Sequence, residues 1–342
     1  MTGSNRSTWL VDAADFPVGG DLTDLLRFVL RYATLSPSSH NSQPWLFRLD
    51  GHSVELHADH RRRLPVVDPD DRELVMSCGA ALVTLCLALR HFGVEVEVTT
   101  MPDERDSALL ARVEVVGWTS VPDSNYDDLF AAITARHTTR TAYEPIPVPA
   151  DLVARMEHAV SVERAQLVVV TAQRETITHL VTEADRVQMS DPRFRRELAH
   201  WMRTNQPAAD DGMPGYAIGM SELESAVGPL VVRTFDVGSR QAAKDEDLAR
   251  GSALLAVLTT AHDGIADWIA AGQAMQRVLL TATAAGLRAS FLNQPIEVQS
   301  LRQRLRNTLG LAGHPQLLLR FGYGTSGAPT PRRSVSDVLT TT

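Results

Sequence analysis

The sequence repeats its own order of elements once, and this repeat constrains the fold more than any other feature. Three pairs of residues have the same separation along the chain: Gly79 with Gly272, Gly93 with Gly286, and Pro102 with Pro295. Long helices rich in alanine are predicted at 72–92 and 268–285, and each ends at a glycine. Each half is expected to run helix, strand, long helix, short strand and final strand. We therefore expect an α+β fold built from two similar halves, 1–124 and 125–342.

Hydrophobic periodicity predicts the other elements of each half. In the first half they are a helix at 24–35, strands at 46–49, 53–57, 94–99 and 109–116, and a linker at 121–124. In the second half they are helices at 127–135, 151–160, 175–188 and 194–203, and strands at 167–170, 252–260, 288–292 and 316–322. The last segment, 324–342, is expected to be an exposed tail.

A polar loop follows the first helix. Pro37 disfavours helical geometry at the residue before it, so the helix should stop there, and Pro44 gives an extended entry into the strand at Trp45. Between the prolines the polar residues are Ser38, Ser39, Asn41, Ser42 and Gln43. Such a group of donors and acceptors suits a planar heterocycle rimmed with carbonyl and N–H groups. A solvated connection is the alternative, because these residue types also form turns.

A segment of the second half, 204–241, is long for a loop inside a compact domain, and such loops are usually lids, binding loops or disordered inserts. Its glycines and prolines are expected to prevent a long regular helix: Gly212, Pro214, Gly215, Gly219, Gly228, Pro229 and Gly238. The segment also carries Met213, Tyr216 and Met220. Apolar side chains on such a loop need a surface to cover. We therefore predict a lid.

Composition excludes several classes of function. A net charge of −8 speaks against a nucleic-acid partner. The two cysteines, Cys78 and Cys86, provide neither a disulfide framework nor a zinc spacing, so no metal is expected. No apolar run is long enough to span a membrane, and a cytoplasmic protein is expected. P-loop, GxGxxG, GxSxG and HExxH motifs are absent from the sequence.

The two halves carry complementary sets of polar residues. The sequence Arg136-His137-Thr138-Thr139-Arg140 opens the second half and has no counterpart before the first helix of the first half. The polar loop of the first half has no counterpart after the helix at 151–160. This pattern is what a fused dimer would show after losing one of two identical sites.

The segment 36–45 resembles the PSSxNxQPW segment of the flavin-dependent nitroreductase family. Three further segments resemble parts of the same family: 136–140 its N-terminal flavin-binding segment, 291–295 the loop behind the flavin N5, and Arg332-Arg333 its C-terminal basic pair. The resemblance runs from about residue 24 to 339. The fused, two-halved form with an insert is most similar to Acg-type nitroreductases, and it implies an intramolecular pseudo-dimer with one FMN at its interface.

The resemblance also implies residue roles. Residues expected against the flavin ring are Pro37, Ser38, Ser39, Asn41 and Gln43. Arg136 and Thr138 would hold phosphate or ribityl oxygens, and Arg140 would lie near the N1/C2 edge. Main-chain groups of Leu292, Asn293 and Gln294 would face N5. Arg332 and Arg333 would bind the phosphate, as guanidinium forks suit a phosphate monoester.

The expected function is an FMN oxidoreductase that takes electrons from NAD(P)H and passes them to a nitroaromatic, quinone or similar acceptor. No side chain need act as acid or base, because the flavin carries the hydride chemistry. The lid restricts this reaction. One alternative is an FMN-sequestering or regulatory protein without turnover, and another is a flavin-free remnant of the fold. FMN, NAD(P)H and a small electron acceptor are the expected ligands of a monomer or weak homo-oligomer.

Overall fold

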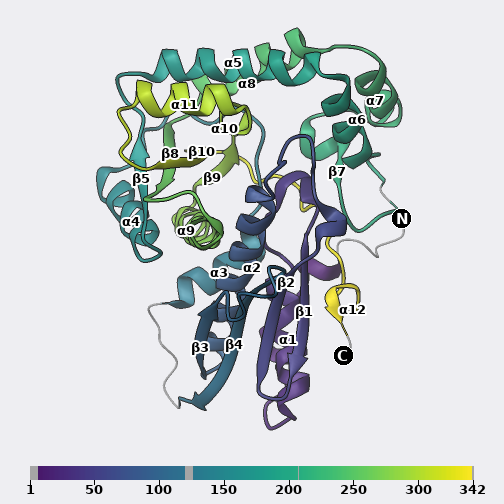
Figure 1. The fold of residues 1–342 in the computed structure, drawn as a ribbon, viewed down its shortest axis with the longest axis vertical. Helices are drawn as coiled ribbons and strands as arrows, with labels where there is room; N and C mark the ends of the chain where they lie inside the picture. The colour runs from purple at the N-terminus through teal and green to yellow at the C-terminus, as the bar shows by residue number, and fades with distance from the viewer. Residues whose placement is uncertain (1–6, 120–125, 207, 341–342) are drawn as a thin grey trace.

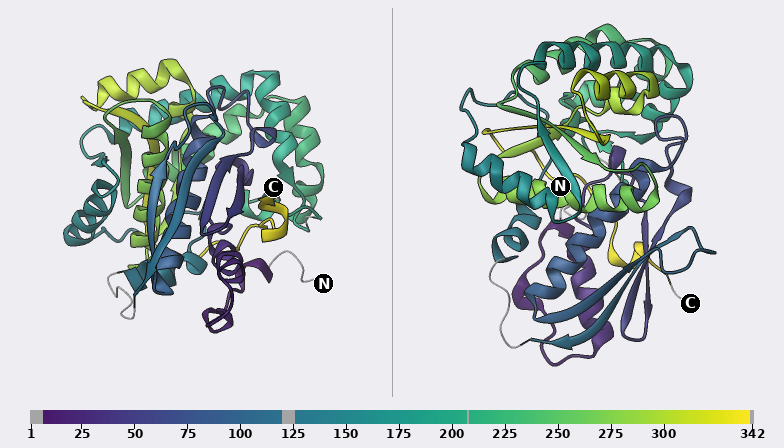
Figure 2. Two further views of the ribbon diagram at one scale, coloured as in Figure 1. Left: turned by 60° about the horizontal axis from the view of Figure 1, so that its bottom comes forward. Right: turned by 60° about the vertical axis from the view of Figure 1, so that its left-hand side comes forward.

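The computed structural model describes residues 7–119, 126–206 and 208–340 (Figure 1). The linker predicted at 121–124 lies outside them. The two halves are stacked in the right-hand view of Figure 2, with the purple and blue elements of the first below the green helices of the second, and the yellow C-terminal segment lies beside the first half.

The first half contains a five-stranded sheet in the order β11-β1-β2-β4-β3. Its strands are β1 (Trp45–Asp50), β2 (Ser53–Ala58), β3 (Val94–Thr100), β4 (Leu109–Trp118) and the short β11 (Leu339–Thr340). β1 and β2 form a hairpin whose turn contains Gly51 in the left-handed region, at φ 57°. Helices α1 (Leu22–Ala33) and α2 (Arg72–His91) pack against the sheet, and Asp21 caps α1 by accepting a hydrogen bond from the Asp24 amide.

The second half contains a four-stranded sheet in the order β5-β8-β10-β9. Its strands are β5 (Ala165–Val169), β8 (Leu254–Thr260), β9 (Arg288–Phe291) and β10 (His314–Gly322). The strands of both sheets pair antiparallel in the same chain order, β1-β2-β4-β3 in one and β5-β8-β10-β9 in the other, with β11 added parallel at one edge of the first. The predicted α+β class and the internal repeat are confirmed.

The two long helices of the repeat, α2 and α9 (Ile265–Ala284), cross at their paired glycines. A Cβ at Gly79 would lie 2.3 Å from the Ile269 carbonyl oxygen, and one at Gly272 would lie 2.0 Å from that of Met76. The helices therefore approach closely enough to leave no room for any side chain at the crossing. The second pair, Gly93 and Gly286, follows the helix ends with φ of 76° and 81°, as helix-terminating glycines do.

The sheets differ in how they are covered. Strand β8 is buried at every residue, because α4 (Ala150–Ser161) and α9 cover one face of its sheet and other helices the opposite face (Figure 1). The latter are α5 (Arg174–Ser190), α8 (Gly238–Arg250), α10 (Gln294–Glu297) and α11 (Gln299–Thr308). In β4, buried and exposed positions alternate toward its end, as expected when only one face is covered. The sequence did not predict α10 and α11.

The long connection between β5 and β8 replaces the tight β1–β2 hairpin of the first half. It contains α5, α6 (Pro192–Trp201), β6 (Met202–Arg203), β7 (Met213–Pro214), α7 (Glu222–Thr234) and α8. No single helix crosses 204–241, as expected, but the glycines and prolines do not exclude a shorter one, because α7 contains both Gly228 and Pro229. Gly228 lacks the Cβ that would clash with the proline ring, and a capping box of Ser221 and Glu224 begins the helix.

The C-terminal segment crosses from the second half to the first. β11 pairs in parallel with β1, and α12 (Val335–Val338) buries Val338 in the first core (Figure 1). The expectation of an exposed tail over 324–342 was therefore wrong for the described part. Helix α3 (Asp127–Ala135) follows the predicted division at 124/125 but also packs Phe130 and Ile133 into the first core. The halves thus exchange segments.

One described helix, α2, has the length and apolar composition of a membrane span, and 89% of its apolar window is buried inside the protein. Cys78 and Cys86 lie in it as buried free thiols. No group of three or more His, Cys, Asp or Glu side chains suited to a metal occurs among the described residues.

Candidate functional site

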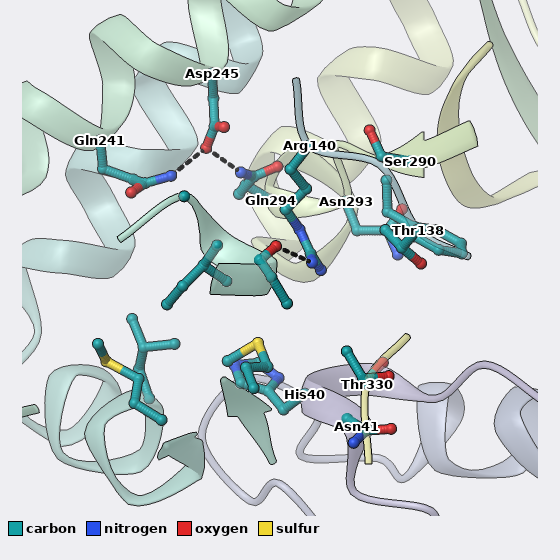
Figure 3. Close-up of a pocket in the computed structure, with 18 of the residues that line it drawn as sticks. His40, Asn41, Thr138, Arg140, Gln241, Asp245, Ser290, Asn293, Gln294 and Thr330 are labelled. Carbon is teal, nitrogen blue, oxygen red and sulfur yellow. Dashed lines mark hydrogen bonds between the residues drawn. The ribbon is translucent and has the colours of Figure 1, made fainter. Parts of the chain in front are cut away.

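A cavity of about 700 Å³ lies between the two halves and beneath the insert. Figure 3 shows its polar lining, with Arg140, Ser290, Asn293 and Gln294 facing His40, Asn41 and Thr330. Its walls combine the polar loop, the 136–140 segment, the β9–α10 loop and the tail. The structure thus brings together four segments that are far apart in the sequence.

The polar loop supplies one wall in a strained backbone conformation. His40, Asn41 and Gln43 have φ of 52°, 55° and 51°, a region that side chains other than glycine rarely adopt. The Gln43 amide donates to Ser38 Oγ at 2.9 Å, and the Asn41 side-chain amide donates to the carbonyls of Gly212 at 2.9 Å and Pro331 at 3.0 Å. These bonds hold Pro37, Ser38, Ser39 and Asn41 at the cavity.

Two buried arginines form a basic end of the cavity. Arg332 donates from Nη1 to Asn41 Oδ1 at 2.7 Å and to Thr330 Oγ1 at 2.6 Å. Arg136 and Arg332 both donate from Nη2 to the Leu35 carbonyl, at 3.2 and 3.3 Å. The Nε atoms of both arginines are buried without a hydrogen-bond partner in the described structure. Both guanidinium groups therefore carry a buried donor that the described structure leaves unsatisfied.

The charge of this pair is uncompensated. Neither arginine forms an ion pair with an acidic residue of the described chain, although both line the cavity. Burial lowers the pKa of Arg136 to about 10, and burial together with the Arg136 charge lowers the pKa of Arg332 well below its usual value. An anion would relieve both effects, and a guanidinium pair with free N–H groups suits a phosphate.

Aromatic residues complete the basic end. The Arg332 guanidinium lies 4.8 Å from the centroid of the Trp9 ring, a cation–π contact. His137 meets Trp9 edge-on at 4.5 Å between centroids. Burial, and then the charges of Arg136, Arg332 and Arg288, lower the pKa of His137 to about 3. His137 is therefore neutral at physiological pH, and the positive charge belongs to the arginines. Sequence reasoning gave no role to Trp9 or His137.

The 136–140 segment and the β9–α10 loop form the opposite wall (Figure 3). Thr138 makes a parallel bridge with Ala289, which extends the edge of the second sheet and directs the segment along the cavity. Arg140 donates from Nη1 to the Ala217 carbonyl at 3.2 Å, and its burial lowers its pKa. The amide of Gln294, at the first position of α10, has no acceptor within its helix.

Four predicted site residues do not line the cavity. Leu292 is buried, and its amide donates to the Leu318 carbonyl at 2.9 Å, so it is not free for a ligand. Gln43 donates to the Asp210 carbonyl and accepts from the Arg333 amide, both at 2.8 Å. The Arg333 guanidinium donates to the Gln43 carbonyl at 3.0 Å, and the Tyr216 hydroxyl donates to the Pro329 carbonyl at 2.9 Å. They hold segments together around the cavity.

The cavity also contains buried carboxyl groups that sequence reasoning did not identify. Asp245 Oδ2 accepts hydrogen bonds from the side chains of Gln241 at 2.7 Å and Gln294 at 2.8 Å (Figure 3). Burial, and then the neighbouring Asp245, raise the pKa of Asp185 to about 8, so this pair shares a proton near neutral pH. The two residues lie on α5 and α8, and no local motif connects them.

Glu73 links the two walls. Its carboxylate accepts hydrogen bonds from Ser39 Oγ of the polar loop and from Asn293 Nδ2 at 3.4 Å, and it pairs with Arg72 at 3.1 Å. Burial, and then the charge of Glu73, raise the pKa of Glu297, which also lines the cavity. One end of the cavity is therefore basic, and other parts carry neutral or paired carboxyl groups.

Comparisons with known proteins identify what the chain is similar to. A model of the Nitroreductase family matches residues 133–323. The chain is 35% identical over 322 residues to "Putative NAD(P)H nitroreductase Rv3131" of Mycobacterium tuberculosis (strain ATCC 25618 / H37Rv), covering 92% of this chain and 91% of that relative. It is 26% identical over 324 residues to "Putative NAD(P)H nitroreductase acg" of the same strain, covering 93% and 96%. Among solved structures, the FMN-dependent nitroreductase NfnB from Mycobacterium smegmatis in complex with NADPH aligns at 16% identity with a TM-score of 0.41, covering 64% of this chain and 100% of that one.

Proposed function

Because the chain belongs to the nitroreductase family, we propose that it binds one FMN between its halves and acts as an NAD(P)H-dependent reductase under a lid. The observation that carries this proposal is the pair of buried arginines, Arg136 and Arg332, with unpartnered Nε atoms and no acidic partner among the described residues. Burial of a charge is costly unless it is paired, so this pair calls for an anionic ligand. The phosphate of FMN fits that requirement.

In this proposal the remaining cavity residues hold the rest of the cofactor. Thr138 and Arg140 lie on one wall and Ser39 and Asn41 on the other, so a flat ring would be held between the two halves. A buried guanidinium at Arg140 favours negative charge on the edge of the ring. The proposal assigns the amide of Gln294, which has no acceptor within its helix, to a ring nitrogen. When bound, FMN supplies the hydride-transfer chemistry.

The names of the relatives as NAD(P)H nitroreductases support NAD(P)H as the electron donor. Sequestration of FMN without turnover is the second candidate, and contacts of the lid favour it. Asn41 bonds the carbonyl of Gly212, Gln43 that of Asp210, and Arg140 that of Ala217. Three residues expected against the cofactor are thus tied to the insert, and access from outside requires these bonds to break.

The test compares Arg332→Ala with Arg333→Ala, an adjacent arginine that does not line the cavity. FMN and riboflavin are titrated into each apoprotein and binding is followed by flavin fluorescence. Arg332→Ala should lose about tenfold or more in FMN affinity, since hydrogen bonds to charged groups contribute about 1.5–3 kcal/mol. The affinity of Arg332→Ala for riboflavin should fall little, because riboflavin has no phosphate.

Arg333→Ala should change the affinities for FMN and riboflavin to the same extent, because Arg333 contacts the polar loop from behind and does not line the cavity. Equal losses of FMN and riboflavin in Arg332→Ala would place the phosphate elsewhere. Failure of the wild-type apoprotein to bind FMN would refute the cofactor assignment itself.

A further inference from the structure

The cavity extends beyond the polar site into a compartment built by the insert. This compartment, the methionine chamber, is lined by Met189, Phe194, Met202, Met213, Met220 and Val231. These residues come from α5, α6, β6, β7, α7 and the connection before α7 that holds Met220, so none belongs to the segments that carry the arginines or the polar loop. In Figure 3 the labelled polar residues leave one side of the cavity to sulfur-containing and aliphatic side chains.

The chamber wall is apolar and adaptable. Four of the nine methionines of the chain line it. Methionine side chains are flexible and polarisable, and they accommodate ligands of different shapes. Among the described lining residues from 189 to 237, Glu224 is the only charged one, and its carboxylate accepts from the Ser221 amide at 2.9 Å to cap α7. The chamber therefore offers no unengaged charge to a ligand.

Helix α7 gives this chamber an apolar mouth. Val227 and Val231 line the cavity and are also 47% and 38% exposed, so they lie at the boundary between the chamber and the solvent. Leu223 and Leu230 of the same helix, and Phe235 directly after it, are also exposed apolar side chains. Exposed apolar patches of this kind mark binding or entry sites. This surface gives an apolar molecule a path from the solvent into the chamber, and the charged residue that lines it, Glu224, is engaged in the cap of α7.

We propose that the methionine chamber binds an uncharged, poorly water-soluble small molecule, which enters across Val227 and Val231 of α7. The ligand is expected to be uncharged because the chamber wall is apolar, and burying an unpaired charge among these side chains would be costly. The inference deepens the proposed function by assigning the apolar part of the electron acceptor to the insert, and that role rests on the proposed function. Binding itself does not require turnover.

The experiment uses two probes with the same rings, neutral N-phenylnaphthylamine and anionic anilinonaphthalene sulfonate. Each is titrated into the FMN-loaded protein, and binding is followed by probe fluorescence and by calorimetry. The neutral probe should bind about tenfold or more tightly than the anionic one. Its heat capacity of binding should be negative, as burial of apolar surface requires.

Val231→Asp places a charge at the mouth and should weaken the neutral probe about tenfold or more. Val187→Asp is the matched control, because Val187 is an exposed helical valine on α5 outside the cavity. It should leave binding unchanged. Val231→Trp, which fills the mouth without adding charge, should also weaken binding, so the test remains decisive if the aspartate variant unfolds.

Equal binding of the two probes, or unchanged binding of the neutral probe in both folded Val231 variants, would overturn the proposal. FMN content is measured separately by absorbance in every sample. If the FMN-loaded protein does not bind the neutral probe, this inference alone is refuted. If the protein takes up no FMN but still binds the neutral probe, the proposed function alone is refuted.

Discussion

At the scale of the residue, the site depends on groups held in unfavourable states. His40, Asn41 and Gln43 occupy left-handed backbone conformations, and Arg136 and Arg332 are buried without a carboxylate partner among the described residues. Each such state costs on the order of 1–3 kcal/mol or more, so neighbouring contacts must offset it. Strain and unpaired charge concentrated at one cavity are a physical sign of a ligand site.

The glycine at the helix crossing provides the first prediction. Gly272→Ala should lower the free energy of unfolding by about 2 kcal/mol or more, because its Cβ would meet a backbone carbonyl that cannot move aside. Urea denaturation measures the effect. Gly264→Ala is the control, since its Cβ would have only the Asp267 carboxylate nearby, at 3.7 Å. If Gly272→Ala lowers the free energy of unfolding no more than Gly264→Ala does, the close approach of α2 and α9 is disproved.

The Asp185–Asp245 pair makes stability depend on pH. The pKa of Asp185 is raised to about 8 in the folded protein, against about 3.8 when unfolded, so the folded state binds more protons between these values. The proton held by Asp185 therefore stabilises the folded state fully below about pH 4, and this stabilisation is lost as the pH rises towards 8. Asp185→Asn removes it while keeping a neutral group beside Asp245.

The wild type should therefore lose more stability between pH 5 and 8 than Asp185→Asn does, by about 1 kcal/mol per pH unit over part of the range. Parallel urea titrations across this range give the difference. The comparison also cancels the opposite contributions of His40 and His137, whose pKa values are lowered by burial. Identical pH profiles would show that Asp185 ionises normally.

At the scale of the element, the insert contacts the first half in two places. Glu197 of α6 accepts hydrogen bonds from the amides of Val66 and Val67 at 2.9 Å, and a short stretch at 210–212 lies beside the polar loop. Asp211 pairs with Arg62 of the first half and with Arg203 of the insert at 2.7 Å. Arg62 also lies over the Trp201 ring, at 5.4 Å from its centroid. Because the stretch lies directly beside the polar loop, its release would uncover the cavity.

Arg62→Ala should open the insert and speed flavin reduction by NAD(P)H several-fold, because an ion pair, a cation–π contact and a hydrogen bond to the Ser42 carbonyl are lost together. Stopped-flow absorbance of the FMN-loaded protein follows the reduction. Arg61→Ala is the matched control, since the Arg61 side chain is 78% exposed and its one partner among the described residues is Asp59. The same rate in both variants and the wild type would show that the insert does not limit access.

At the scale of the whole molecule, the chain places a two-subunit architecture in one polypeptide. The two sheets share a strand order, and the C-terminal segment adds β11 and Arg332 to the first half. One cavity receives the polar loop from one half and the 136–140 segment from the other. Two halves with a single set of complementary parts should make a single site.

The chain should therefore bind one FMN. Flavin released by denaturation is quantified by absorbance against protein measured by amino-acid analysis, after saturation and removal of free FMN. A ratio near one is expected, because each half supplies only part of the polar lining. A reproducible ratio of two would mean that both halves retain a site and would contradict the complementary loss.

The sequence by itself determined the features that depend on local pattern. Glycines at matched positions predicted the repeat, and hydrophobic alternation predicted β1 and β3, because periodic burial is encoded within each element. The polar loop and the 136–140 segment were identified by composition, and the structure places both at the cavity. Boundaries of these elements differ from the predicted ones by a few residues at most.

Only the tertiary structure decided the features that depend on packing between distant segments. Arg332 and Arg333 are adjacent in sequence, yet one turns into the cavity and the other bonds the polar loop from behind. Helix α7 forms around Pro229 because capping and contacts outweigh the lost hydrogen bond. Asp185 and Asp245 become a pair only when α5 packs on α8. In each case the deciding free energy comes from burial and contacts across the chain, which no local pattern records.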